Sequence, residues 1–192
     1  MKNKQGISLI VLIVTIIVII ILAAVVILTL NQNTNPIDSS RVAQLVDNRS
    51  NINSAVSLYY GKKMAETQGA YDAKNIFTGK NNSDEAISGI TALVTTTGIG
   101  DKYYTFNTDD SGTDQVKALL NISLPAITGA TWYLDVDTGL VYLVFETKDN
   151  VPAWMKTNSD KSALDSTLNQ FVKVKNSESN SIEDLSLIHI WR

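Results

Sequence analysis

Two aspartate-rich segments contain the residues whose types and spacing could bind a metal ion. Asp135 and Asp137 are separated by one residue and followed by Gly139, and residues 109–114 hold three further aspartates. Aspartate oxygens are common ligands of Ca²⁺, but neither segment has the spacing or the terminal glutamate of an EF-hand. Aspartate, serine and glycine are also the residues that tight turns require. We therefore expect turns at both places, with Asp135 and Asp137 as the alternative calcium ligands.

The rest of the composition argues against catalysis and against binding to nucleic acid. The sequence has no cysteine, which excludes disulfides, thiolate nucleophiles and cysteine-bound metals, and its one histidine is His189. It contains no Ser/His/Asp set, glycine-rich phosphate loop or pair of catalytic carboxylates. Lys and Arg number 16 against 19 for Asp and Glu, so a basic patch for nucleic acid is not expected. We expect no enzyme activity, no cofactor and no nucleic-acid partner.

An uninterrupted apolar run near the N-terminus dominates the hydropathy pattern. Between Ile7 and Leu30 the only polar residues are two threonines and one serine, and none is charged. As a helix this run would reach about 36 Å, more than the ~30 Å thickness of a bilayer's hydrocarbon core. Lys2 and Lys4 precede it, which places the N-terminus in the cytoplasm. The run predicts a transmembrane helix over 7–30 in a single-pass membrane protein, with residues from 31 onward outside the cell.

The residues before and within this run carry a more specific pattern. Residues 1–6 read Met-Lys-Asn-Lys-Gln-Gly, a short basic leader that ends in Gly6 and is followed directly by Ile7. This leader resembles the class III leader of type IV pilins and type II secretion pseudopilins, and Ala23 and Ala24 match the family's Ile-Leu-Ala-Ala segment. The resemblance implies that a prepilin peptidase cuts after Gly6 and methylates the new N-terminus at Ile7. It also implies other pilin-like subunits as partners, through an assembly helix.

One position departs from the family pattern. Pilins usually have a glutamate at the fifth mature position, which pairs with the N-terminal amine of a neighbouring subunit; here that position is Val11. The resemblance therefore implies a minor pilin or pseudopilin more than a bulk fibre subunit. The alternative is an ordinary signal anchor, which would make the chain an unprocessed single-pass surface protein that binds an extracellular partner.

Residues 31–184 form the predicted outer domain, of the α+β class. Apolar residues recur every three or four positions over 38–66, which predicts an amphipathic helix whose apolar face packs on the domain's own sheet, with a partner-binding groove as the alternative. Aromatic and β-branched runs flank an Asp-x-Thr-Gly turn, which predicts a hairpin of 131–135 with 140–146. The other expected elements are a loop over 69–82, strands over 102–106 and 171–175 (the latter at an edge), and short helices over 83–94, 114–120 and 160–170. The predicted fold is a long N-terminal transmembrane helix continuing into an amphipathic helix on a small antiparallel sheet, as in pilins.

The C-terminal residues 185–192 form a separate segment. After a polar stretch, the apolar sequence Leu-Ser-Leu-Ile-His-Ile-Trp-Arg begins abruptly. It resembles the translation of a transposon end used in preparing sequencing libraries. We expect it to be a sequencing-adapter artefact; the alternative is a genuine C-terminal strand.

Overall fold

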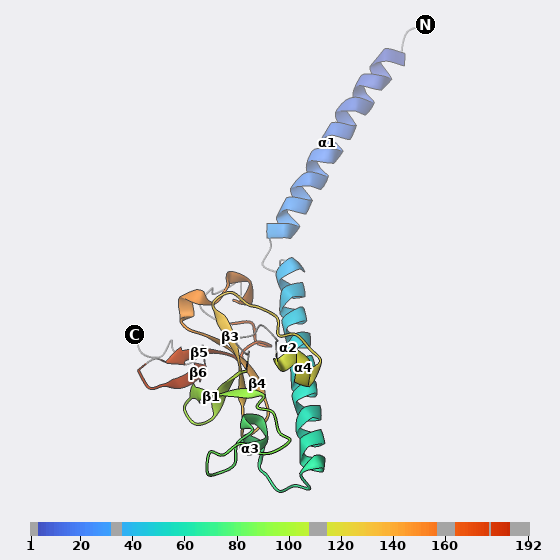
Figure 1. The fold of residues 1–192 in the computed structure, drawn as a ribbon. Coiled ribbons are helices and arrows are strands. Elements are labelled where there is room, and N and C mark those ends of the chain that lie inside the picture. The colour runs from blue at the N-terminus through green and yellow to red at the C-terminus, as the bar shows by residue number, and fades with distance from the viewer. Residues whose placement is uncertain (1–3, 32–35, 108–114, 157–163, 177, 185–192) are drawn as a thin grey trace. The chain divides into compact units, whose positions relative to one another are not determined.

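The structure is a computed structural model that describes residues 4–31, 36–107, 115–156, 164–176 and 178–184, with side chains throughout these ranges except 4–10, 25–31, 96 and 97. The chain divides into two compact units, Met1–Arg41 and Val42–Arg192. Figure 1 shows the elements of each unit along the chain. The two units are described separately.

The first unit consists of helix α1 (Lys4–Asn31) and the first turns of helix α2 (Pro36–Glu66). Pro36 suits the first position of a helix, because its backbone nitrogen carries no hydrogen and its φ is already helical. Asp38 lies in the first turn of α2, where the helix dipole favours a negative charge, and its carboxylate lies 3.6 Å from the Arg41 guanidinium.

The predicted transmembrane helix is corrected by the structure. Among the residues that the structure describes, no helix is both long and apolar enough to cross a bilayer. The prediction of a membrane-spanning helix over 7–30, as part of the fold class, is therefore wrong.

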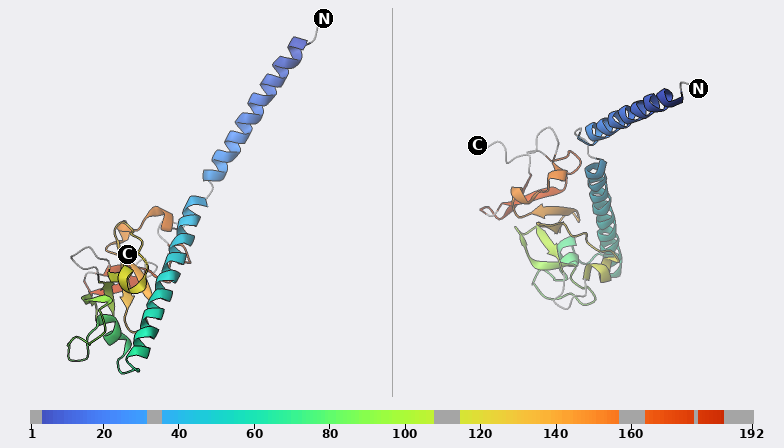
Figure 2. Two further views of the ribbon diagram at one scale, coloured as in Figure 1. Left: turned by 45° about the vertical axis from the view of Figure 1, so that its right-hand side comes forward. Right: turned by 90° about the horizontal axis from the view of Figure 1, so that it is seen from above.

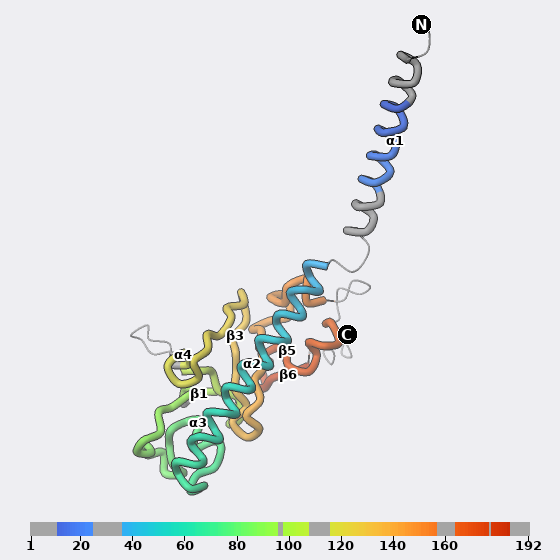
Figure 3. The backbone as a smooth tube through the Cα atoms, turned by 90° about the vertical axis from the view of Figure 1, so that its right-hand side faces the viewer, coloured from blue at the N-terminus to red at the C-terminus, as the bar shows by residue number. Residues whose placement is uncertain are grey.

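Helix α2 confirms the amphipathic helix predicted over 38–66. Figure 3 shows α2, from Val42 onward, running along the folded body of the second unit. The residues of its inner face are at most 5% exposed and belong to the main hydrophobic core, together with residues of the sheet: Leu45, Ile52, Val56 and Tyr59. Their spacing follows the helical repeat, so one continuous face is buried. The predicted packing of this face on the domain's own sheet is confirmed.

Two polar side chains of α2 fix its position on the sheet at a single residue of strand β4 (Val141–Phe145). Asn53 Oδ1 accepts a hydrogen bond from the backbone N–H of Val141 at 2.9 Å. Arg49 Nε donates to the backbone carbonyl of Val141 at 3.2 Å, and its guanidinium lies 4.7 Å from the ring centroid of Phe171. These contacts satisfy both backbone groups of Val141 where the strand begins.

The sheet has six strands, arranged in the order in which they occur along the chain. The strands are β1 (Val94–Ile99), β2 (Tyr103–Phe106), β3 (Ala130–Asp135), β4, β5 (Val172–Asn176) and β6 (Ser181–Asp184). Neighbouring strands are antiparallel except β4 and β5, which are parallel. The predicted antiparallel sheet is therefore wrong in this respect, because the 26 residues between β4 and β5 are long enough for the chain to cross back before the next strand starts.

The hairpin and two short elements agree with the sequence prediction. Strands β3 and β4 pair in register, with Thr131 opposite Val144 and Leu134 opposite Val141. The strand predicted over 102–106 is β2, and the helix predicted over 114–120 is α4 (Gln115–Leu120).

Four local predictions differ from the structure. The predicted loop over 69–82 contains helix α3 (Ala73–Thr78), and the predicted helix over 83–94 is a series of turns followed by β1. Asp84 has a φ of 63°, which does not fit a right-handed helix. The described residues of the helix predicted over 160–170 form turns, and β5 is an interior strand because β6 pairs with its outer side. Residues 185–192 lie outside the described part of the chain.

The two faces of the sheet form different cores, and the alternation of side chains along β3 and β4 decides which residue joins which core. Trp132 and Leu134 of β3 belong to the main core, whereas Tyr133 lies in a smaller cluster on the other face with Ile99 and Val144. Figure 2 shows α2 along one side of this sheet in two further views. Two 3₁₀ helices, η1 (Lys148–Asn150) and η2 (Ala153–Met155), lie in the crossover between β4 and β5.

Candidate functional site

The residues predicted for processing and assembly all lie on α1. Gly6 and Ile7 fall in its first turn, and the helix continues through them without a break. Val11 is 55% exposed, and Ala23 and Ala24 are also exposed. These residues therefore share one helix.

The described surface of α1 is apolar on every side. Its large apolar side chains are between 47% and 64% exposed, and they occupy consecutive positions: Val11, Leu12, Ile13, Val14, Ile16, Ile17, Val18, Ile19, Ile20, Ile21 and Leu22. Thr15 interrupts this series, but its hydroxyl donates to the backbone carbonyl of Leu12 at 2.8 Å and so needs no outside partner. A helix that is apolar all round is normally covered in its working state. We call the surface formed by residues 11–22 the α1 surface.

The turn after β3 is organised by Asp135, one of the two alternative calcium ligands. This side chain is 1% exposed, and its Oδ1 accepts hydrogen bonds from the backbone N–H groups of Asp137 and Thr138 at 3.0 and 3.2 Å. Its Oδ2 lies 3.1 Å from the ammonium of Lys102, which reaches it from the start of β2. A hydrogen bond to Asp135 raises the pKa of Lys102. Both carboxylate oxygens therefore act within the protein, as a turn requires.

The other predicted metal ligands do not join this carboxylate. Asp137 is exposed in the same turn. The second aspartate-rich segment, 109–114, lies outside the described residues. Among the described residues no three His, Cys, Asp or Glu side chains lie close enough together to hold a metal ion.

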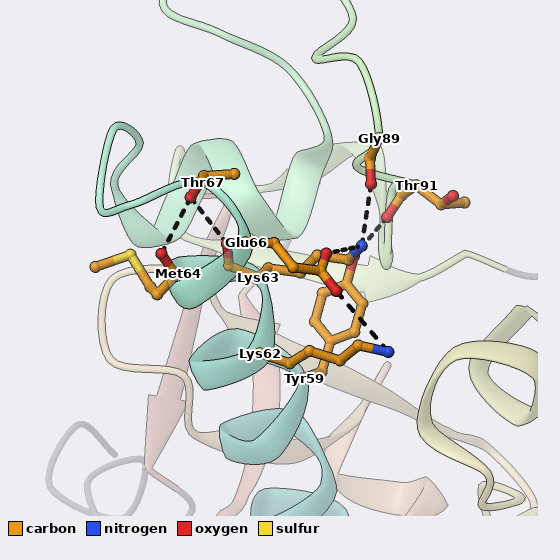
Figure 4. A network of polar contacts seen from close by, with 8 residues as sticks. All are labelled: Tyr59, Lys62, Lys63, Met64, Glu66, Thr67, Gly89 and Thr91. Atoms are coloured by element: carbon orange, nitrogen blue, oxygen red, sulfur yellow. Dashed lines mark hydrogen bonds and ion pairs between the residues drawn. The ribbon is translucent and has the colours of Figure 1, made fainter.

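A polar network that the sequence analysis did not single out holds the end of α2 against the segment before β1 (Figure 4). Tyr59 donates its phenol hydrogen to the carbonyl of Thr91 at 2.7 Å. Lys63 donates to the carbonyl of Gly89 at 3.0 Å and to the Glu66 carboxylate at 2.7 Å. Burial raises the pKa of Tyr59 to about 12, and Glu66 adds to this effect; the hydrogen bond from Lys63 lowers the pKa of Glu66. The network fixes residues 89–91 relative to α2.

The second unit also has a pocket of about 340 Å³, which we call the Lys74 pocket. Its lining comes from α3, from the turn after α3 and from β2: Lys74, Asn75, Thr78, Lys80, Asn81, Asn82, Asp84 and Tyr104. The loop predicted over 69–82 gives no indication of this pocket, because the pocket depends on helix α3. The signal for α3 was present as Asp72, whose side chain accepts from the N–H of Asn75 at 2.8 Å, and Gly79, which ends the helix with a φ of 67°.

No protein-family model, curated protein or solved structure matches this chain.

Proposed function

We propose that the chain is a structural subunit of a pilin-like assembly at the cell surface, processed by a prepilin peptidase after Gly6. The observation that carries the proposal is the α1 surface, whose apolar side chains are about half exposed on all sides of the helix. The inner face of α2 is not available to bind another protein, because it is already buried in the hydrophobic core of its own unit. In the proposed assembly, α1 helices of other pilin-like subunits cover this surface.

The magnitude of the exposed surface supports helix packing as the driving force. A Val, Leu or Ile side chain gains about 1.5–3 kcal/mol when it is fully buried. The eleven large side chains of the α1 surface are each about half exposed, so complete coverage would contribute on the order of 10 kcal/mol before the entropy cost of association.

The chemistry at Val11 supports a minor subunit. A valine offers no charge to the N-terminal amine of a neighbour, so this subunit would be held by apolar contacts alone. The missing charge pair at Val11 is tolerated better at the end of an assembly, where only one side of the subunit must pair, than at a repeated position along a fibre.

Processing is tested by co-expression with a prepilin peptidase followed by intact-mass and N-terminal peptide analysis. We expect loss of residues 1–6 and a methyl group on the new N-terminus at Ile7, because Gly6 occupies the position after which the peptidase is proposed to cut. Gly6→Val should remain unprocessed, whereas Gly61→Ala, which changes a glycine of α2 with no atom within 4 Å of the added methyl group, should be processed normally. A wild-type chain that keeps residues 1–6, or a Gly6→Val chain that loses them, would contradict the proposal and favour an unprocessed surface-binding protein.

A further inference from the structure

The Lys74 pocket contains a buried acceptor that the described residues do not satisfy. Asn75 is 7% exposed, and its amide nitrogen donates to the carbonyl of Lys80 at 2.7 Å and to Asn82 Oδ1 at 3.2 Å. Both amide hydrogens are therefore used, which fixes the orientation of the side chain. Within the described part of the chain, no donor contacts Asn75 Oδ1. Buried acceptors are normally paired, so a hydroxyl donor from a ligand fits this position.

The charge of the pocket wall is positive. The Lys80 ammonium lies 2.8 Å from the Asp84 carboxylate, so these two charges offset each other. Lys74 has no carboxylate within 4.0 Å among the described residues, and its ammonium lies 6.0 Å from the ring centroid of Tyr104. One positive charge therefore remains without a partner of opposite sign. A single ammonium of this kind matches a ligand with one negative charge, such as a carboxylate.

Further polar groups in the lining favour a ligand that carries several hydroxyls. The Thr78 hydroxyl donates to the carbonyl of Lys74 at 2.7 Å, which leaves its oxygen free to accept. Asn82 accepts from Asn75 through Oδ1, so its own amide nitrogen is a donor for a ligand. The volume of 340 Å³ lies at the lower end of the range for ligand pockets, which suits a ligand of about one sugar ring.

The walls of the pocket are held in place before any ligand binds. Asn81 Oδ1 accepts from the backbone N–H groups of Ser83 and Glu85 at 2.9 and 3.0 Å, which fixes the turn. The N–H of Ile87 donates to the carbonyl of Gly79 at 2.9 Å, which ties the turn to the end of α3. A site that is ordered in advance loses less entropy on binding.

We propose that the Lys74 pocket binds a small hydroxylated carboxylate of the hexuronic acid class, with Lys74 on the carboxylate and Asn75 Oδ1 on a ring hydroxyl. This inference does not depend on the proposed assembly function, because every contact that carries it lies in the second unit.

The test is isothermal titration calorimetry of the full-length chain, kept in solution with a nonionic detergent, against D-glucuronate, D-glucose, glucose 6-phosphate and acetate. We expect glucuronate to bind with a Kd of about 1 mM or tighter, and glucose and acetate to bind at least about tenfold more weakly, since each lacks one of the two recognised groups. Glucose 6-phosphate distinguishes a phosphate source from a carboxylate source, and tighter binding of it would overturn the carboxylate assignment.

Two variants and one control localise the binding. Lys74→Gln should weaken glucuronate binding about tenfold, as expected for loss of a charge-assisted hydrogen bond, and should leave the weak binding of glucose unchanged. Asn82→Ala should weaken glucuronate and glucose alike. Lys117→Gln removes an exposed lysine of α4 that does not line the pocket, and it should bind as wild type. Absence of glucuronate binding, equal binding of acetate, or unchanged binding by Lys74→Gln would each overturn the proposal.

Discussion

Removing the carboxylate of Asp135 should destabilise the second unit by an amount that depends on what replaces it. In Asp135→Ala the backbone N–H groups of Asp137 and Thr138 lose their acceptor, and Lys102 loses its partner. In Asp135→Asn the side-chain carbonyl can still accept from both N–H groups, and only the ion pair with Lys102 is lost. The pair of variants therefore separates the turn from the charge.

The two losses differ in size. Each N–H bond to the carboxylate is worth about 1 kcal/mol in a turn that is partly open to solvent, and the ion pair about 0.5 kcal/mol, because the Lys102 side chain is 41% exposed. Asp135→Ala should thus cost about 2.5 kcal/mol, and Asp135→Asn about 0.5–1 kcal/mol. At roughly 2–4 °C per kcal/mol for a chain of this length, the Tm should fall by about 5–10 °C and about 1–4 °C, respectively.

Thermal unfolding followed by circular dichroism measures both values, with and without added Ca²⁺. The difference between wild type and Asp135→Asn should stay constant from pH 6 to 9. The raised pKa of Lys102 means that its contribution is fully present below the ordinary lysine value and is lost only as the pH rises through the folded-state value. Equal losses for the two variants would refute the dominant role of the turn hydrogen bonds. A Ca²⁺-dependent rise in Tm that Asp135→Asn abolishes would refute the assignment of Asp135 to the turn in favour of calcium binding.

Two further predictions concern single side chains of the second unit. A methyl group at Gly98 would lie 2.2 Å from the carbonyl oxygen of Tyr103, so Gly98→Ala should lower the free energy of unfolding by about 2 kcal/mol or more, measured by urea denaturation. The matched Gly61→Ala in α2 should instead raise it by about 0.5–1 kcal/mol, because alanine favours a helix; a similar effect at both sites would contradict the packing argument. Between pH 10 and about 12 the Tyr59 phenol stays protonated in the folded chain but ionises on unfolding, which lowers the free energy of unfolding of the wild type as the pH rises. Tyr59→Phe has no phenol to ionise, so its free energy of unfolding should fall less over this pH range. Identical alkaline unfolding curves for Tyr59→Phe and wild type would show that this phenol does not control the transition.

Local patterns determined the elements that depend on neighbouring residues. The helical spacing of Leu45, Ile52, Val56 and Tyr59 predicted α2 and its buried face, because a helix and its packing stripe are both set by a repeat of 3.6 residues. The hairpin of β3 and β4 was predictable for a similar reason, since strand preference and turn chemistry meet within 16 residues. By contrast, α3 was too short for a periodic signal.

Strand order and the Lys74 pocket could not be predicted in this way. The parallel pairing of β4 with β5 depends on how the long crossover packs, and β6 changes β5 from an edge strand into an interior one. The pocket joins α3 to Tyr104 of β2, which lies almost 30 residues further along the chain. No spacing within either segment indicates that they meet.

The sequence by itself determined the apolar character of α1, the basic segment that ends in Gly6, and the valine at position 11. These are properties of consecutive residues, and they motivate the proposed processing after Gly6. Only the tertiary structure decided that Asp135 serves a turn and Lys102, and that Lys74 lacks a carboxylate partner among the described residues. The physical reason is that a charged or polar group acts through the partners within a few ångströms of it, and those partners come from distant parts of the chain.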